Sequence, residues 1–442
     1  MTMRGGVLIC ALPLALLLPW LPARAAELKV GDVLGQDNAA AAKELLPPDI
    51  LAHYQAGEYR NAIVDYPLTN VHWEASFEEA TKKNAATLDV NDAGAIVEKA
   101  SGKQPGYVYG IPFPAIDPAD PKAATKIVWN QFLAYWNHGS TYNVTRVILL
   151  QPKGIDRDIQ ANGWFKFYDG QSEKYRDAEN PMNLQSQFLG VATSPADLNG
   201  TASLTWRYRD ADKRDSVWAY VPALRRVRAV SPANRSDGYL GSDISGDDGF
   251  FFDGKPEDFT WELVGKRDAF RIVDPKSVSG TVPVEPVPGG GWVTLTKDGP
   301  PSAGFEDPQW RGVSWAPLNG GLAKRPVWVV RGTPKDRYYL FGKLELWIDA
   351  INWAGSWNRK FDWKGEQVSN YQLMYGPNQP AGPEAAREWV PAATQVWACA
   401  ENLKLKRATL GGMRAYRDAA FQVRVPVPAS IFESSAMMRI GK

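Results

Sequence analysis

Apolar and polar side chains alternate with a period of two along much of the chain after Tyr142, in runs short enough to be β-strands. In one such run Leu204, Trp206 and Tyr208 share a face, and the residues between them are polar. The next run, 216–221, follows after a polar turn, so the two are predicted to pair as a hairpin. Repetition of this pattern predicts an antiparallel meander. The other predicted strands are 144–150, 164–168, 259–266, 327–331, 337–341, 343–349, 359–364 and 396–406.

Helical segments are predicted mainly before these strands. The run 123–136 has a broad apolar face at helical spacing, which is typical of an amphipathic helix. A large sheet with one strongly aromatic face must cover that face. We therefore expect an α+β fold, in which a large, strongly curved antiparallel sheet carries helices over its concave face. The other predicted helices are 38–59, with a break at Pro47–Pro48, 74–87, 93–100 and a short terminal helix at 429–438.

The first 25 residues have the pattern of a secretory signal peptide. Arg4 precedes an apolar stretch, 7–22, which is interrupted by prolines and too short to span a bilayer. It ends in Ala23–Arg24–Ala25, the small-x-small pattern of a signal-peptidase site. We expect an exported protein, periplasmic in a Gram-negative host. The predicted divisions are the signal peptide 1–25, an N-terminal helical segment 26–105 and a curved-sheet domain 106–442, with a joint at the Pro- and Gly-rich stretch 278–291.

Composition excludes several classes of protein. Lys and Arg number 50 against 49 Asp and Glu, so the chain lacks the basic excess of a nucleic-acid binder. Two cysteines and three histidines are too few for a disulfide scaffold or a Cys- or His-rich metal centre. The G-x-S-x-G, H-E-x-x-H and G-x-x-x-x-G-K-[ST] motifs are absent, so we expect no enzyme activity and no cofactor.

Four acidic residues after Arg235 could supply oxygen ligands to calcium: Asp243, Asp247, Asp248 and Asp253. Their spacing does not match the known calcium-loop pattern. Short polar turns and pairing with nearby arginines are favoured instead, so we expect no metal site.

Aromatic residues on the predicted strands are candidates for a ligand-binding wall. Tryptophan and tyrosine combine an apolar body with a polar tip, so they suit a packed core or a cavity wall, and both interpretations stay open. Three arginines that follow Pro222 are either a solvated edge or a cavity rim that pairs with a phosphate or carboxylate head group. The candidate wall residues are Trp164, Phe167, Trp206, Tyr208, Trp218 and Tyr220, and the candidate head-group residues are Arg225, Arg226 and Arg228.

Three segments resemble known proteins. Residues 218–228 and 236–244 look like recurring segments of the LolA/LolB-like outer-membrane lipoprotein-sorting proteins. Residues 110–114, followed by Trp129 and Asn130, resemble a large bacterial family of unknown function that is similar to that group. The resemblance implies an unclosed β-barrel with helices as a lid. Its interior would hold acyl chains or another hydrophobic molecule.

The same resemblance implies a role in the cell envelope. Members of that family tend to be encoded beside resistance-nodulation-division-type transporters and outer-membrane proteins, which implies periplasmic ferrying between two membranes. We therefore expect a carrier of lipid or another hydrophobic molecule, with an inner-membrane transporter and an outer-membrane protein as partners. The alternative is a secreted β-rich carbohydrate-binding protein or glycan-active enzyme, because the many Trp and Tyr residues also suit sugar stacking.

Overall fold

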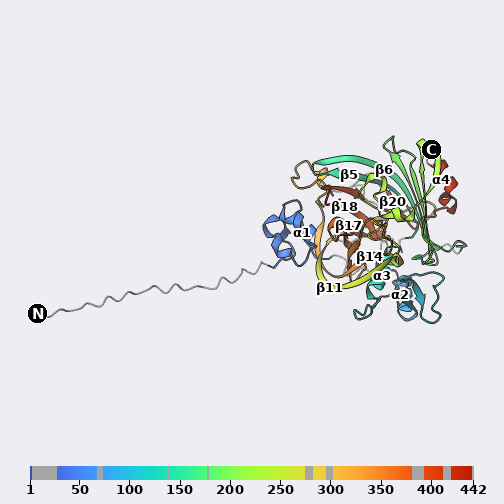
Figure 1. Cartoon of the computed structure of the whole chain (residues 1–442), viewed down its shortest axis with the longest axis horizontal. Coiled ribbons are helices and arrows are strands. Elements are labelled where there is room, and N and C mark those ends of the chain that lie inside the picture. The colour runs from blue at the N-terminus through green and yellow to red at the C-terminus, as the bar shows by residue number, and fades with distance from the viewer. Residues whose placement is uncertain are drawn as a thin grey trace.

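A computed structural model gives the fold of the chain (Figure 1). The predicted signal peptide lies outside the residues that the structure describes. Apart from Met1, those residues are 27–66, 73–136, 139–176, 179–273, 282–294, 302–380, 393–411 and 420–440.

Most of the described residues belong to one large sheet, in which 18 strands are described. Its first half is an antiparallel meander of consecutive strands, as the alternating sequence predicts: β5 (Thr141–Gln151), β6 (Gly154–Phe167), β7 (Leu184–Ser194), β8 (Ala202–Tyr208), β9 (Ser216–Val221) and β10 (Arg226–Val230). Its second half comprises β11 (Phe259–Val273), β14 (Gly321–Pro334), β15 (Lys343–Asp349), β16 (Gly355–Phe361), β17 (Gln367–Pro380), β18 (Ala393–Asn402) and β19 (Arg407–Gly411).

The two halves join where β5 pairs with β19 and with β20 (Ala420–Val423). Short strands complete the sheet: β1 (Val33–Leu34), β2 (Asn61–Ile63), β12 (Val282–Pro286) and β13 (Trp292–Thr294). Among the described strands, β10 and β11 at the two ends make no pair with each other, so the curved sheet stays open, as predicted. It is mixed rather than purely antiparallel, because β2 runs parallel to β14, and β12 runs parallel to β17.

The helices agree with most of the sequence predictions. The break at Pro47–Pro48 separates the 3₁₀ helix η1 (Gln36–Ala42) from α1, whose first residue is proline. The predicted helices 74–87, 123–136 and 429–438 are also present. In the described residues the helices are α1 (Pro48–Gln55), α2 (Ala75–Thr87), α3 (Ala123–Trp136) and α4 (Ser434–Ile440). Short 3₁₀ turns there are η2 (Pro222–Leu224), η3 (Pro232–Ser236), η4 (Tyr239–Gly241), η5 (Pro256–Asp258), η7 (Gly304–Glu306) and η9 (Ala429–Phe432).

Three local predictions are wrong. The predicted helix 93–100 holds β4 (Ile96–Glu98), which pairs with β3 (Leu88–Val90) because the tight turn at Gly94, with φ +95°, reverses the chain. The predicted strand 337–341 is a turn, in which the Tyr338 amide donates to the Asp336 carboxylate. The stretch 278–291 is expected to be a long loop or a joint; its residues 282–286 form β12 of the sheet, so the loop prediction is wrong there, while the joint stays a prediction.

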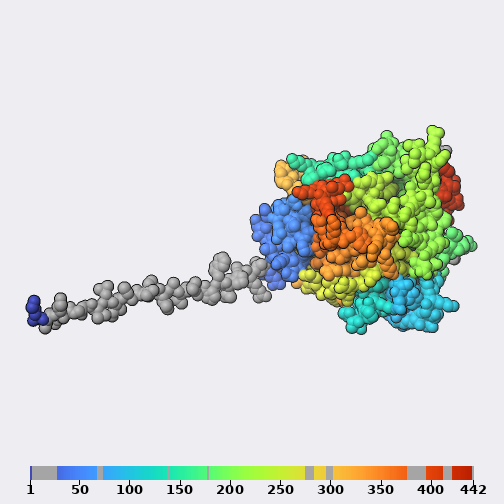
Figure 2. All heavy atoms as spheres, in the orientation of Figure 1, coloured from blue at the N-terminus to red at the C-terminus, as the bar shows by residue number. Residues whose placement is uncertain are grey.

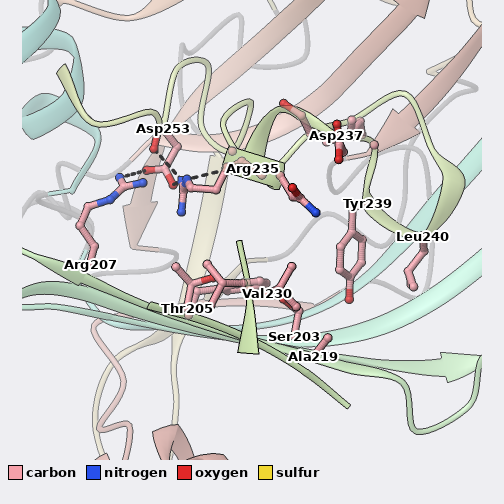
Figure 3. A pocket seen from close by; sticks show the side chains of 18 of the residues that line it. Ser203, Thr205, Arg207, Ala219, Val230, Arg235, Asp237, Tyr239, Leu240 and Asp253 are labelled. Atoms are coloured by element: carbon pink, nitrogen blue, oxygen red, sulfur yellow. Dashed lines mark hydrogen bonds and ion pairs between the residues drawn. The ribbon is translucent and has the colours of Figure 1, made fainter. Parts of the chain in front are cut away.

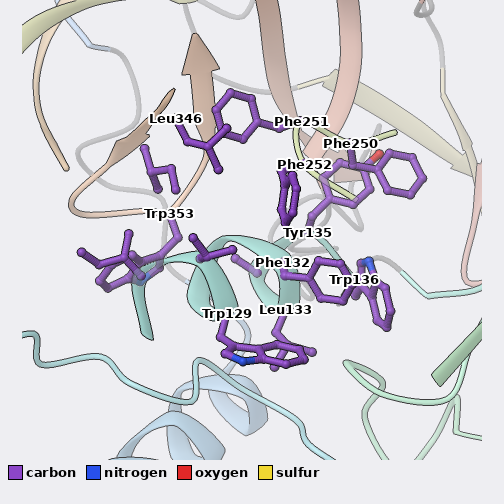
Figure 4. Packing of buried hydrophobic residues seen from close by; sticks show 14 of the residues in the cluster. Trp129, Phe132, Leu133, Tyr135, Trp136, Phe250, Phe251, Phe252, Leu346 and Trp353 are labelled. Atoms are coloured by element: carbon purple, nitrogen blue, oxygen red, sulfur yellow. The ribbon is translucent and has the colours of Figure 1, made fainter. Parts of the chain in front are cut away.

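Alternate residues of the second half of the sheet belong to two different cores. Val327 and Val329 of β14 pack in a cluster with η1 and α1, whereas Trp328 and Val330 pack in a cluster with α3. Figure 4 shows α3 surrounded by aromatic side chains from distant segments, including Phe250, Phe251 and Trp353. Both faces of this half are therefore covered.

The N-terminal residues occupy two separate places on the sheet. The segment with α1 and the segment with α2 lie on different sides of the molecule, as the blue and light-blue regions of Figure 2 show. Phe77 of α2 belongs to the core cluster of α3, and Ile50 of α1 belongs to the other cluster. No helix in the described part of the chain is both long and apolar enough to cross a membrane.

Candidate functional site

A cavity of about 450 Å³ lies between the first half of the sheet and a long crossing segment, residues 231–253, which we call the lid segment (Figure 3). This volume falls in the range of small-molecule binding pockets. The strand side is contributed by β6, β7, β8, β9 and β10. The residues that line the cavity are Phe165, Phe167, Ser186, Phe188, Thr201, Ala202, Ser203, Thr205, Arg207, Val217, Ala219, Val230, Ser231, Asn234, Arg235, Asp237, Gly238, Tyr239, Leu240, Ile244, Ser245, Gly246, Gly249 and Asp253.

The strand wall of the cavity is built from rows of residues that face one another across neighbouring strands. One row crosses five strands, and each member of it lines the cavity: Phe165, Phe188, Thr205, Val217 and Val230. The next row includes Gly190, Ser203 and Ala219, and a Cβ added at Gly190 would lie 3.3 Å from the Tyr239 hydroxyl. The wall is therefore aromatic at one side and small or hydroxyl-bearing at the other.

The lid segment is held in an irregular path by short local contacts. Ser231 caps η3 by accepting a hydrogen bond from the Ala233 amide. Gly238 bridges to Ser245, and a Cβ at position 238 would lie 1.8 Å from the Ser242 carbonyl oxygen. Leu240 adopts a left-handed conformation, with φ +52°. Such a path depends on contacts with the rest of the molecule.

Three aspartates anchor the lid segment to the second half of the sheet and its loops. Asp243 pairs with Arg407 at 3.0 Å, and Asp248 pairs with Lys360, which is itself buried. Asp247 accepts a hydrogen bond of 3.0 Å from the Tyr339 hydroxyl. The predicted pairing of the acidic set with nearby arginines is confirmed for Asp247 and Asp253, which both contact Arg235. Within the described segments, no group of three His, Cys, Asp or Glu side chains is arranged to hold a metal ion.

One end of the cavity is closed by a buried charge cluster of two arginines and three aspartates: Arg207, Arg235, Asp215, Asp247 and Asp253. Arg235 contacts all three carboxylates, at 2.6 Å to Asp247, 3.0 Å to Asp215 and 3.5 Å to Asp253. Burial would lower the pKa of Arg235, but these carboxylates raise it. Arg235 therefore fastens the lid segment to the strands as a permanent cation.

The charge cluster carries one more acid than base. Burial raises the pKa of Asp253, while Arg207 and Arg235 lower it less strongly. The pKa of this carboxyl is therefore above its usual value, which limits the net negative charge at the cavity end. An anionic group of a ligand at this end of the cavity would lie close to three carboxyl groups, which disfavours its binding.

Two buried donors at the cavity lack a hydrogen-bond acceptor. The Tyr239 hydroxyl projects from the lid segment toward the strands, and burial raises its pKa to about 12, so it is a neutral donor at physiological pH (Figure 3). The Nη1 of Arg207 makes no hydrogen bond and reaches Oδ1 of Asp253 at 3.5 Å. Buried polar groups are normally satisfied, so these two atoms mark where a ligand acceptor would fit.

The structure places most of the candidate wall residues on the other face of the same strands. Trp164, Trp206, Trp218 and Tyr220 pack in a cluster with Phe432 and Met437, from η9 and α4. Tyr208 packs with Tyr168 and Leu184, outside the cavity. Phe167 is the one candidate of the six that lines the cavity.

The three candidate arginines are exposed and do not line the cavity. Arg225 is the left-handed residue of the β9–β10 turn, with φ +48°. Arg228 faces Ala219 across the strand pair, so it stands on the cavity face at the end of the Ser203–Ala219 row. Arg226 lies one pleat beyond it on the same face.

Sequence reasoning missed Phe188, Arg235 and Tyr239, the last two because irregular segments give no periodic signal. The alternation that grouped Trp206 with Tyr208 also separated Thr205 and Arg207 onto the face that lines the cavity. The resemblance at 236–244 pointed to the lid segment, although not to its role.

Comparison with protein families identifies the chain. Residues 33–438 match the family described as "Protein of unknown function (DUF1329)". The chain belongs to this family. The match spans both halves of the sheet, the lid segment and the start of α4, so all parts of the site lie in the family's common region. A comparison with curated proteins finds no match.

Solved structures are similar to this DUF1329 protein at low identity. A candidate outer membrane lipoprotein-sorting protein domain from Vibrio parahaemolyticus has 13% identity and a TM-score of 0.47, over 72% of this chain and 100% of that one. A DUF1329 family protein from Desulfovibrio piger has 14% identity and a TM-score of 0.43, over 70% and 97%. A LolA superfamily protein from Nitrosomonas europaea has 12% identity and a TM-score of 0.41, over 70% and 97%.

Proposed function

We propose that this protein is a non-enzymatic carrier that binds one molecule with an apolar body in the cavity beneath the lid segment. The observation that carries the proposal is the cavity itself: a space of about 450 Å³ with an aromatic wall and two unused donors. Small-molecule sites combine a mainly apolar lining with a few placed polar groups.

The energetics of apolar cargo favour a carrier that hands its ligand to another apolar site. Burial of an acyl chain gains about 0.8 kcal/mol per methylene, so a 16-carbon chain gains roughly 12 kcal/mol gross. Release into water is therefore slow, and transfer needs a receiving protein or bilayer. Movement of the lid segment would open the cavity. Its end, Phe250 to Phe252, is packed in the core of α3, so the moving part would be the stretch before it, which ion pairs of Arg235 and Asp243 hold in place.

The charges around the cavity favour a neutral polar head on the ligand. The Tyr239 hydroxyl and the Arg207 Nη1 both require an acceptor. A carboxylate would accept from them but would add charge beside Asp253 and Asp215. We therefore propose a hydroxyl, carbonyl or ester head. Arg226 and Arg228, which are exposed outside the lining, are proposed as rim residues that would contact an anionic group of the cargo that stays outside the cavity.

The proposal extends to the cell envelope. Cleavage of residues 1–25 would deliver the mature protein to the periplasm. There it would receive or deliver cargo with a resistance-nodulation-division-type inner-membrane transporter and an outer-membrane protein as partners. Because the chain is nearly neutral, we propose no nucleic-acid partner.

The carbohydrate-binding alternative requires accessible tryptophan faces. Of the tryptophans that the structure describes, Trp363 alone is exposed, and about half of its surface is covered. A sugar platform predicts strong quenching of the tryptophan fluorescence by iodide, whereas the carrier proposal predicts that most of the emission is protected.

The decisive experiment is native mass spectrometry of the purified mature protein, followed by solvent extraction and displacement of an apolar fluorescent probe. Hexadecanol, hexadecanoate and hexadecylamine are the competing ligands. A stoichiometric apolar molecule, or displacement with hexadecanol strongest, supports the proposal. Failure to take up the probe or any of the three ligands would refute the carrier function. Stronger displacement by hexadecanoate would refute the neutral head and leave the carrier function standing.

A further inference from the structure

Three hairpin turns meet at one end of the second half of the sheet. They connect β14 to β15 (335–342), β16 to β17 (362–366) and β18 to β19 (403–406). The Trp363 indole donates a hydrogen bond of 2.9 Å to the Tyr339 carbonyl, which joins the first turn to the second. Lys404 pairs with Asp362 at 3.1 Å, which joins the second turn to the third. The three turns therefore form one surface, which we call the hairpin end.

Large apolar side chains at the hairpin end point into solvent. Tyr338 is 89% exposed, Leu405 59%, Leu340 52% and Trp363 49%. Each turn contributes at least one of them. Single exposed apolar residues are ordinary, but four on adjacent turn tips form a patch that marks an interaction site.

The hairpin end is also basic, although the whole chain is nearly neutral. The three turns, 335–342, 362–366 and 403–406, contain five Lys and Arg residues against three Asp and Glu, whereas the entire chain has a formal charge of +1. Two of the three acids, Asp362 and Glu366, already pair with Lys404. The exposed aromatic and leucine side chains therefore lie among more cations than anions, and both of these ion pairs use the same cation, Lys404.

We propose that the hairpin end docks on the surface of an anionic lipid bilayer. Trp and Tyr favour the membrane–water interface because an apolar ring and a polar group are satisfied there together. Lysine and arginine near such rings gain from the negative surface potential of anionic lipids. The hairpin end has short apolar tips surrounded by cations and has no long apolar stretch. This combination fits shallow binding at the membrane–water interface rather than insertion into the bilayer.

The hairpin end contacts the lid segment that covers the cavity, so docking on a bilayer would bring the cavity close to the membrane. The Leu340 amide donates a hydrogen bond of 2.9 Å to the Ser236 hydroxyl of the lid segment. Tyr339 of the β14–β15 turn donates a hydrogen bond to Asp247 of the lid segment. Arg407, the first residue of β19 after the third turn, pairs with Asp243 of the lid segment. A protein bound by the hairpin end would hold its lid segment at the bilayer, where apolar cargo can leave without crossing water. This consequence rests on the proposed function, whereas the docking itself does not.

The test is sedimentation of the full mature protein with vesicles of phosphatidylcholine, with and without phosphatidylglycerol. Ile351 supplies a matched control because it is 61% exposed on the β15–β16 turn, at the opposite end of the same strands. We expect binding to the anionic vesicles that weakens with added salt. Tyr338→Ser combined with Trp363→Ser should lower the partition by about tenfold or more, while Ile351→Ser should leave it unchanged.

Several outcomes would overturn the docking proposal: no binding to anionic vesicles, equal binding to both kinds, or equal loss in the Ile351→Ser control. If the double variant does not fold, Tyr338→Ser alone provides the test, since that side chain is almost wholly exposed. Probe uptake by the cavity should persist in the double variant. Loss of vesicle binding with retained uptake separates this proposal from the carrier function.

Discussion

The indole Nε1 of Trp206 donates a hydrogen bond of 2.8 Å to the backbone carbonyl oxygen of Phe432, 226 residues later in the chain. Phe432 is fully buried, and Trp206 packs edge-on against Trp218 at 5.2 Å between ring centroids. This contact fixes the C-terminal segment on the face of β8 and β9 that lies opposite the cavity. The C-terminal segment therefore supports the cavity wall from behind.

Replacement of this indole should affect stability more than ligand binding. Trp206→Ala removes a packed ring and leaves the Phe432 carbonyl without its partner, so we expect a loss of about 2–4 kcal/mol in the free energy of unfolding. Urea denaturation measures it. The residual folded protein should still take up an apolar probe with unchanged affinity. Loss of uptake without loss of stability would instead assign Trp206 to a binding wall.

A larger side chain on the cavity wall should block the ligand. Ala219→Phe places a ring in the space between β9 and the lid segment, so we expect probe affinity to fall by about tenfold or more with little change in stability. Ala229→Phe is the matched control, because Ala229 is exposed on the neighbouring strand β10 and does not line the cavity. Equal effects of the two substitutions on fluorescence titration would place the ligand elsewhere.

Removal of the central cation from the charge cluster should loosen the lid segment. Arg235→Met leaves Asp215, Asp247 and Asp253 with Arg207 as their remaining cation in the cluster, and breaking such a buried network costs about 3–5 kcal/mol. We expect faster amide hydrogen exchange across residues 231–253 and faster probe release. Asp212→Asn, which removes an exposed charge on the β8–β9 turn outside the cavity lining, should alter neither. Unchanged exchange in Arg235→Met would show that other contacts hold the lid segment.

Stability should decline in mildly alkaline solution because of one histidine. His53 of α1 lies between Glu58 at 2.7 Å and Glu401 of β18 at 2.9 Å. Burial lowers the pKa of His53, but hydrogen bonds to Glu401 and Glu58 outweigh it and raise the pKa from 6.5 to about 9. A raised pKa means that the folded state holds the proton more tightly than the unfolded state does, and this difference stabilises the fold. The stabilisation is complete below pH 6.5 and disappears as the pH rises through 9.

Protonation of His53 contributes about 3 kcal/mol to the free energy of unfolding. Urea denaturation at pH 6 and at pH 10 should show the wild-type protein losing more stability than His53→Gln over the same interval. The variant controls for the titration of lysines and tyrosines, which both proteins share. Parallel pH profiles for the two proteins would contradict the linkage.

The sequence predicted helices and strands correctly where the apolar residues had a strong periodicity. It predicted them poorly where a side chain stabilised a local turn instead of a regular element. The helix 123–136 and the hairpin of β8 and β9 are present as expected, because each has a long or clearly alternating pattern. The run 337–341 looked like a strand, but Asp336 accepts from the Tyr338 amide and turns the chain. Such local capping by side chains is invisible to a count of apolar residues.

The sequence alone determined which residues of β8 share a face: Leu204, Trp206 and Tyr208 on one side, and Ser203, Thr205 and Arg207 on the other. Only the tertiary structure decided which of these faces meets the cavity. Both faces of the strand are covered, one by η9 and α4 and the other by the lid segment, and each cover comes from a different part of the chain. A period of two is symmetric between the faces, so the choice belongs to contacts that are distant in sequence.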